Sequence, residues 1–214
     1  NRYALHIPYF PYARADRVFD SGASFGLQAF IKLIDWTMIS SIGVCDIHNY
    51  KNLQKLIPNV KIYNMNSAAI ILDGVIENLD RSSTYLVSPD KGGVKRAVLV
   101  KEDLSLGTPI IECEKIRNVA TGKIEYFSVN FDGDLTGKTC ILIDDICDAG
   151  GTFIPIAKKL KEKGADKVYL YVTHGIFSKG LSPFEKDIDG VFSMCSIGDY
   201  VTINDLVNFN DRRK

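Results

Sequence analysis

The chain has 214 residues, a hydrophobic content of 46%, and 26 basic side chains that balance 26 acidic ones. This length allows one large or two small domains. The net charge is zero, and the one basic cluster is the terminal Arg212–Lys214. Both observations argue against a nucleic-acid partner. No apolar run reaches the roughly 20 residues that a membrane-spanning helix needs, so no membrane partner is expected either.

Short β-rich runs alternate with amphipathic stretches, which is the pattern of β-α-β units and a mostly parallel sheet. The predicted strands are Tyr3–Ile7, Met38–Val44, Val60–Tyr63, Tyr85–Val87, Thr108–Cys113, Thr139–Ile143, Val168–Thr173 and Gly190–Met194. The predicted helices are Gly26–Asp35, Tyr50–Leu56, Ser67–Asn78, Gly93–Glu102 and Thr152–Lys163. A further β-rich run, Lys123–Val129, can pair with the strand at 108–113 as an antiparallel hairpin.

The first motif places aromatic and proline residues, from Pro8 to Tyr12, before Arg14 and Arg17. Aromatic rings can stack on a nucleoside and guanidinium groups grip phosphate oxygens, so this run suits a nucleoside phosphate. A surface loop in which Arg14 or Arg17 pairs with Asp16 explains the pattern equally well.

Two motifs follow predicted strands and carry candidate metal ligands. Asp46-Ile47-His48 follows the second strand, so His48 is a candidate ligand at that edge of the sheet. The alternative is a structural role, since a lone histidine is more often structural and imidazole is an uncommon ligand of Mg²⁺. In the run Ser88–Ala97 a strand ends, Asp90 follows, two glycines turn the chain and a helix begins. Asp90 offers the oxygen atoms that Mg²⁺ prefers, or it is only a turn or N-cap residue.

Lys115 and Arg117 follow the strand that ends at Cys113. Alternation places both side chains on one side, where two cations are costly unless an anion lies between them. The pair therefore points to polyphosphate chemistry, or else to a strand edge that charge protects.

The run from Cys140 to Thr152 joins a buried strand to carboxylates, then a small-residue turn, then a helix. Glycine lets the backbone curl around a ligand, and the helix N-terminus holds an anion such as phosphate. Carboxylates at the carboxyl end of the strand can take hydroxyl groups, so the loop suits a sugar phosphate. The alternative is a turn with a solvated acidic edge, which the repulsion between neighbouring carboxylates makes a poor explanation. The candidate residues are Asp144, Asp145, Asp148, Ala149, Gly150, Gly151 and Thr152.

The cysteines indicate a reducing compartment. There are five, an odd number, and none forms a C-x-x-C pair. Several lie in apolar runs, where thiols pack as small hydrophobic groups. We therefore expect a cytoplasmic protein without a disulfide framework.

Taken together, the motifs resemble the ribose-phosphate pyrophosphokinase (PRPP synthetase) family, over about residues 8–178. The acidic loop alone is shared with type I phosphoribosyltransferases, whereas the Ser88–Ala97 run and Lys115-x-Arg117 separate the two families. The matching elements are Pro8-Tyr9-x-x-Tyr12-Ala13-Arg14, Asp46-x-His48, Ser88–Ala97, Lys115-x-Arg117, Asp144–Thr152 and Thr173–Ser178.

The resemblance implies an α/β fold of two phosphoribosyltransferase-like, Rossmann-type domains with mostly parallel sheets. The first would span residues 1–66 and the second 67–200, with a tail at 201–214. The chain starts at Asn1 rather than methionine, and the family begins earlier, so the first domain is expected to be incomplete at its N-terminus.

The resemblance also implies the reaction and its partners. Enzymes of this family make PRPP and AMP from ATP and ribose 5-phosphate, with Mg²⁺, as homo-oligomers that share the nucleotide site between subunits. A PRPP-dependent phosphoribosyltransferase and a non-catalytic regulatory homologue are the alternatives. The family usually has glutamine where this chain has Ala15, so one contact to ATP would be missing.

The implied roles fall on particular residues. Asp144, Asp145 and the loop at 148–152 would hold ribose 5-phosphate, with Arg117 assisting. Lys115 would be the main catalytic cation, and the segment at 114–122, with Gly122 as a hinge, would close over the substrates.

The ATP side of the implied site lies in other motifs. Arg14 and His48 would contact the ATP phosphates, and His48 and Asp90 would ligate Mg²⁺ there. Thr173–Ser178 would be a packing element without a chemical role.

Overall fold

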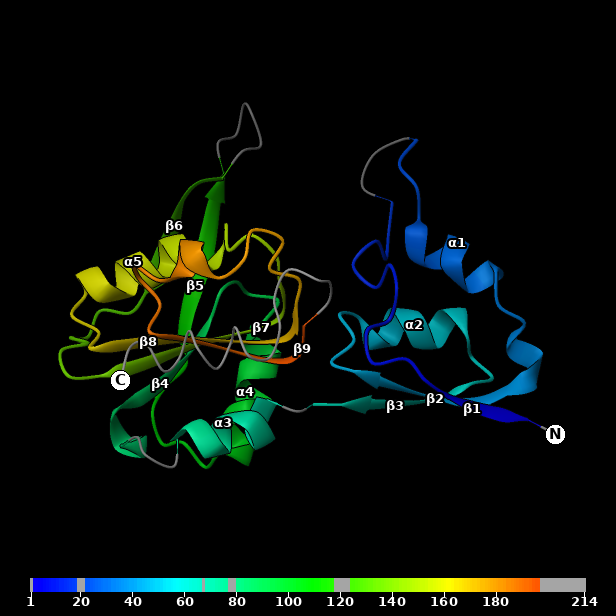
Figure 1. The fold of residues 1–214 in the computed structure, drawn as a ribbon, viewed down its shortest axis with the longest axis horizontal. Helices are drawn as coiled ribbons and strands as arrows, with labels where there is room; N and C mark the ends of the chain where they lie inside the picture. The colour runs from blue at the N-terminus through cyan, green and yellow to red at the C-terminus, as the bar shows by residue number, and fades with distance from the viewer. Residues whose placement is uncertain (1, 19–21, 67, 77–79, 118–123, 197–214) are drawn as a thin grey trace. The chain divides into compact units, whose positions relative to one another are not determined.

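The computed structural model describes residues 2–18, 22–66, 68–76, 80–117 and 124–196 (Figure 1). The chain divides into two compact units, Asn1–Ser67 and Ala68–Lys214. This division lies beside the boundary predicted after residue 66, while the predicted tail at 201–214 lies outside the described residues.

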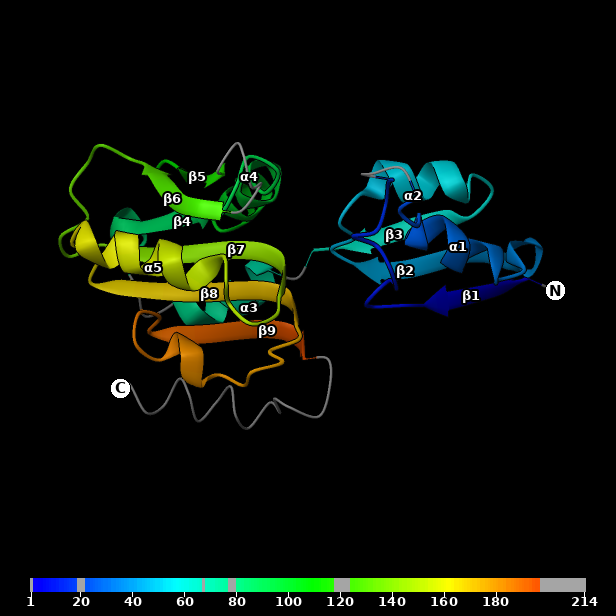
Figure 2. The same cartoon turned by 90° about the horizontal axis from the view of Figure 1, so that it is seen from above.

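The first unit is a three-stranded parallel sheet in the order β1-β2-β3. Leu27, Ile42, Val44, Leu53 and Ile62 form much of its core. Helices α1 and α2 both cover the same face of this sheet (Figure 2). The elements are β1 (Tyr3–His6), α1 (Gly26–Lys32), a short 3₁₀ helix (Trp36–Met38), β2 (Ile39–Cys45), α2 (Tyr50–Leu56) and β3 (Lys61–Met65).

The second unit contains a six-stranded sheet in the order β6-β5-β4-β7-β8-β9. All neighbours are parallel except β5 and β6, which form the predicted antiparallel hairpin. Helices α3 and α4 cover one face and α5 covers the other (Figure 1). The elements are α3 (Ala68–Ile76), β4 (Thr84–Ser88), α4 (Val94–Asp103), β5 (Ile111–Arg117), β6 (Ile124–Asn130), β7 (Thr139–Cys147), α5 (Phe153–Glu162), β8 (Lys167–Gly175) and β9 (Gly190–Ser196), with short 3₁₀ helices at Arg81–Ser83 and Ser182–Phe184.

Helix α5 shows how the sequence pattern sets the packing. Phe153, Ile156, Ala157 and Leu160 are buried against the sheet, while lysines occupy the other face. Gly164, with a φ of +96°, ends the helix in the left-handed conformation that glycine adopts without strain. This helix begins directly after the predicted phosphate loop and is firmly packed against the sheet.

Several strands end later than the sequence pattern predicts, and β5 and β7 differ most. β7 continues from Ile143 to Cys147 because Asp144, Ile146 and Cys147 remain paired with β8. β5 begins only at Ile111 but continues to Arg117, paired with β6. The acidic pair was expected just beyond the end of β7, and the two cations just beyond the end of β5. Both expectations were wrong, because the backbone hydrogen bonding of each strand continues past its apolar residues.

The mixed α/β class with mostly parallel sheets is confirmed. Within the described residues no helix has the length and apolarity needed to span a membrane. All five cysteines are thiols, four of them buried and Cys195 half-buried.

Candidate active site

The second unit brings three predicted motifs to one edge of its sheet. β5, β4 and β7 are neighbouring parallel strands, so their carboxyl ends meet at the same edge. Asp90 follows β4, Lys115 lies near the end of β5, and Asp144 lies near the end of β7. Ligands of open α/β sheets bind at this edge, so the arrangement can form one site.

Asp90 and Lys115 form an ion pair. Lys115 Nζ lies 2.9 Å from Asp90 Oδ2, with 21% of the lysine and 40% of the aspartate side chain exposed. The Gly93 amide donates to Asp90 Oδ1 at 3.2 Å, and the Ser88 hydroxyl donates to the Asp90 carbonyl oxygen at 2.7 Å. The loop therefore fixes a carboxylate beside a cation.

The charge state of Asp90 suits a cation. Burial raises the pKa of this carboxyl, but the Lys115 hydrogen bond and charge, together with the loop amides, hold it below its usual value. The carboxylate is therefore ionised at neutral pH and offers hard oxygen atoms. Mg²⁺ is commonly held by one or two carboxylates plus substrate phosphates, so the oxygen atoms of Asp90 are chemically suited to it.

The acidic pair at the end of β7 has a partner that sequence reasoning missed. Arg96, on α4, donates from Nη1 to Asp144 Oδ1 at 3.0 Å, and its Nη2 lies 4.0 Å from Asp145 Oδ2. Asp144 Oδ1 also accepts the Asp145 amide at 2.8 Å. The spacing of Arg96 four positions before Val100, which is buried, was the signal in the sequence that Arg96 lies on the inward side of the helix.

The turn after β7 needs glycine at one position and leaves room at the next. Gly150 has a φ of +80°, and a Cβ there would lie 2.7 Å from Ile154 Cδ1 and from the Phe184 ring. A Cβ at Gly151 would meet nothing within 4 Å. Gly150 is therefore required by the fold, whereas Gly151 borders open space at the start of α5.

The predicted packing element at 173–178 holds this loop from the side. The Ser178 amide donates to Asp148 Oδ1 at 3.1 Å, and the Ile176 amide donates to the Cys147 carbonyl at 2.8 Å. A Cβ at Gly175 would lie 2.0 Å from the Phe177 ring, so any larger residue there would force the buried Phe177 side chain to shift. The motif thus supports Asp148 directly, which the sequence did not reveal.

The predicted ATP residues belong to the first unit. Arg14 and His48 are exposed, and His48 follows the carboxyl end of β2. Asp16 is buried and accepts Arg17 Nε at 3.1 Å and Asn49 Nδ2 at 2.7 Å. The residue that pairs with Asp16 is therefore Arg17.

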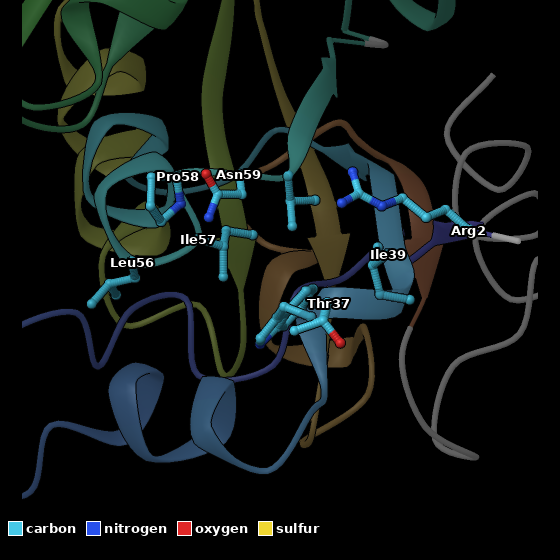
Figure 3. Close-up of a pocket in the computed structure, with 9 residues that line it drawn as sticks. Arg2, Thr37, Ile39, Leu56, Ile57, Pro58 and Asn59 are labelled. Atoms are coloured by element: carbon cyan, nitrogen blue, oxygen red, sulfur yellow. The ribbon is translucent and has the colours of Figure 1, made fainter.

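A pocket of about 480 Å³ also lies in the first unit, between β2, α2 and the segment before β3 (Figure 3). It is found at the amino ends of the strands, where Ile39 begins β2 and Val60 precedes β3, whereas His48 follows the other end of β2. We give it no part in the candidate site. Its lining residues are Arg2, Trp36, Thr37, Ile39, Leu56, Ile57, Pro58, Asn59 and Val60.

Two expectations fall on residues whose placement is not described. The backbone of Arg117 pairs with that of Ile124 at the end of β5, and its side chain lies outside the described part. The predicted closing segment at 114–122 is described only as far as residue 117, so Gly122 and the closure stay predictions.

Comparison with known proteins gives a consistent result. A family model described as phosphoribosyl synthetase-associated domain matches residues 113–192. A ribose-phosphate pyrophosphokinase from Bradyrhizobium diazoefficiens is 35% identical over 174 residues, which are 81% of this chain and 53% of the relative. One from Mycoplasmopsis pulmonis is 35% identical over 196 residues, which are 91% of this chain and 59% of the relative.

A solved structure agrees with these relatives. The crystal structure of phosphoribosylpyrophosphate synthetase from Mycobacterium smegmatis matches 90% of this chain and 61% of its own, with a TM-score of 0.75 and 26% identity. The chain spans about half the length of the curated relatives it matches. In its motifs, its fold and these relatives, the chain is similar to the ribose-phosphate pyrophosphokinase family over the part of those relatives that it covers.

Proposed function

We propose that the chain is a ribose-phosphate diphosphokinase, which transfers the β,γ-diphosphoryl group of ATP to the 1-hydroxyl of ribose 5-phosphate and yields PRPP and AMP. The observation that carries this proposal is the Asp90–Lys115 ion pair of 2.9 Å at the sheet edge that also bears the acidic loop. A carboxylate for a metal and a cation for phosphate beside a sugar-phosphate loop are the groups that a diphosphoryl transfer needs. A PRPP-consuming transferase would not require this pair.

Ribose 5-phosphate is proposed to bind in the loop at 144–152. Asp144 and Asp148 would accept hydrogen bonds from ribose hydroxyls. Asp145 is buried and would contribute through its neighbour Asp144, whose carboxylate it contacts by its amide. The amides of residues 149–152, with Thr152 at the N-terminus of α5, would hold the 5-phosphate, because free N–H groups and the helix dipole favour an anion. The open space at Gly151 supports this assignment.

ATP is proposed to bind with Mg²⁺ through Arg14, His48 and Asp90. A bound Mg²⁺ ion would supply charge neutralisation and orientation of the phosphates. Asp90 suits this role because it is ionised and partly exposed. Arg14 is proposed to grip phosphate oxygens by its planar guanidinium group.

In the transfer, the ribose 1-hydroxyl oxygen forms a bond to the β-phosphorus of ATP. The bond between that phosphorus and the oxygen bridging to the α-phosphate breaks, AMP leaves with the bridging oxygen, and the hydroxyl proton is released. Positioning and charge dominate such reactions, so Lys115, with Arg117, would meet charge that grows on the transferred group. A cation in this role is worth about 10³–10⁵ in rate, roughly 4–7 kcal/mol.

Two further features belong to the same proposal. We expect the chain to form a homo-oligomer. We also expect a cytoplasmic location, because its five cysteines are thiols.

The test is to incubate the chain with Mg²⁺, ATP and ribose 5-phosphate and to measure AMP and PRPP. Equal amounts of both products are expected. Consumption of PRPP with a nucleobase, without AMP formation from ATP, would assign the chain to the phosphoribosyltransferases instead. Binding of ribose 5-phosphate without either reaction would favour a non-catalytic regulatory role.

A further inference from the structure

We infer that Arg96 is a positioning residue for the proposed reaction: it orients the Asp144 carboxylate for a hydroxyl of ribose 5-phosphate. This inference rests on the proposed function and adds a residue to it. Arg96 belongs to the Ser88–Ala97 run but carries none of the roles assigned above.

The contact of Arg96 with Asp144 is built into the fold. Arg96 is 13% exposed and Asp144 16%, and their Nη1 and Oδ1 atoms are 3.0 Å apart. Because the Asp145 amide donates to the same Oδ1 atom at 2.8 Å, two donors converge on one oxygen and fix the carboxylate plane. We therefore assign Oδ2 of Asp144 as the oxygen that faces the ribose hydroxyl.

The charge balance also requires a residue of this kind. Burial, and then the charge of Asp145, raise the pKa of Asp144, and Arg96 opposes both. A guanidinium group stays charged and presents a planar fork, so it can face two neighbouring carboxylates at once. A lysine ammonium, a single point charge, could not serve both in the same way.

Arg96 further joins the two loops of the site. It lies in the first turn of α4, directly after the turn in which the Gly93 amide holds Asp90 Oδ1 at 3.2 Å. Its side chain reaches β7, which carries the acidic loop. The helix that follows the proposed metal-binding loop is thus tied to the proposed ribose-binding loop.

The experiment measures binding of ribose 5-phosphate to the full chain by calorimetry, without ATP, for the wild type, R96Q, R96K, D144N and R96Q/D144N. R96Q should weaken binding roughly 10- to 100-fold, the range for one hydrogen bond between charged groups. R96K should recover only part of this loss. In the D144N background, R96Q should change affinity by less than about twofold, because both substitutions then act on one contact.

K95Q is the matched control, since Lys95 is the exposed neighbour of Arg96 and the charge change is the same. It should bind ribose 5-phosphate within about twofold of the wild type. Urea unfolding of each variant shows that it is folded, and if R96Q does not fold, R96K with and without D144N gives the same comparison.

Wild-type affinity in R96Q would overturn the assignment. An equal loss from R96Q in the wild-type and D144N backgrounds would also overturn it, because Arg96 would then act on the ligand itself. A wild-type chain that does not bind ribose 5-phosphate would remove the proposed function and this inference together. Wild-type binding with an unaffected R96Q removes the inference alone.

Discussion

At the scale of single residues, the Asp90–Lys115 ion pair joins two side chains that are proposed to do different work. Lys115→Ala should lower kcat about 10³-fold or more, because Lys115 is proposed as the main cation that meets charge on the transferred group. Affinity for ribose 5-phosphate should stay within about twofold, since Lys115 Nζ pairs with Asp90, which lies outside the acidic loop. The measurements are the rate of AMP formation and calorimetry.

Lys91→Ala is the control for this prediction. Lys91 lies on the same loop as Asp90 and pairs with Glu114 at 2.7 Å, but 78% of its side chain is exposed. Exposed pairs of this kind contribute little, so both the rate and the fold should be close to those of the wild type. A Lys115→Ala enzyme with near-normal kcat would exclude Lys115 from the mechanism.

Asp144 should give the chain a specific dependence of stability on pH. Burial first, and then the charge of Asp145, raise its pKa from 3.8 to about 7, against the opposing effect of Arg96. Between these values the folded state holds a proton that the unfolded chain has released. The free energy of unfolding should therefore fall as the pH rises from about 4 to about 7.

Asp144→Asn isolates this effect, because it removes the titrating group and keeps its shape. Relative to the wild type, the variant should become more stable as the pH is raised through that window, as measured by urea unfolding at about pH 5 and about pH 7.5. A stability difference that is the same at both pH values would contradict the prediction.

At the scale of elements, the turn after β7 offers two neighbouring glycines with opposite constraints. Gly150→Ala should lower the free energy of unfolding by about 1–3 kcal/mol, because the residue has a φ of +80° and a Cβ would press on Ile154 and Phe184. Gly151→Ala should change it by less than about 0.5 kcal/mol, since a Cβ there meets open space.

Gly151→Ala should affect ligand binding much more than it affects stability. A methyl group there would enter the space proposed for the 5-phosphate, so affinity for ribose 5-phosphate should fall about tenfold or more, at least roughly 1.4 kcal/mol. Urea unfolding and calorimetry on both variants give the comparison. Normal binding by Gly151→Ala would place the phosphate elsewhere.

The elements also show which parts of the site the sequence could predict. The glycine turn, the helix start and the carboxylates of the loop are local features, so their pattern predicts them. Arg96 and Ser178 act through contacts with residues 48 and 30 positions away, which no local pattern contains. The true ends of β5 and β7 were missed for the same reason, since hydrogen bonds to β6 and β8 set them.

At the scale of the whole molecule, the proposed binding residues for the two substrates are distributed differently over the two units. The acidic loop, Arg96, Asp90 and Lys115 all belong to the second unit, while Arg14 and His48 belong to the first. The sequence predicted the fold class and the resemblance to this family because each motif lies at the end of a strand with a clear apolar pattern. We expect the first unit to contribute to ATP binding and the second to hold ribose 5-phosphate on its own.

Arg14→Ala tests this division. It should raise the KM for MgATP about tenfold or more, because a charged hydrogen bond to phosphate is lost, and leave the affinity for ribose 5-phosphate within about twofold. Arg17→Ala is the control, since Arg17 pairs with Asp16 at 3.1 Å and is given no contact to ATP. Steady-state kinetics and calorimetry measure the two effects. A weaker affinity of Arg14→Ala for ribose 5-phosphate would show that the first unit also helps to bind the sugar, and the division between the units would not hold.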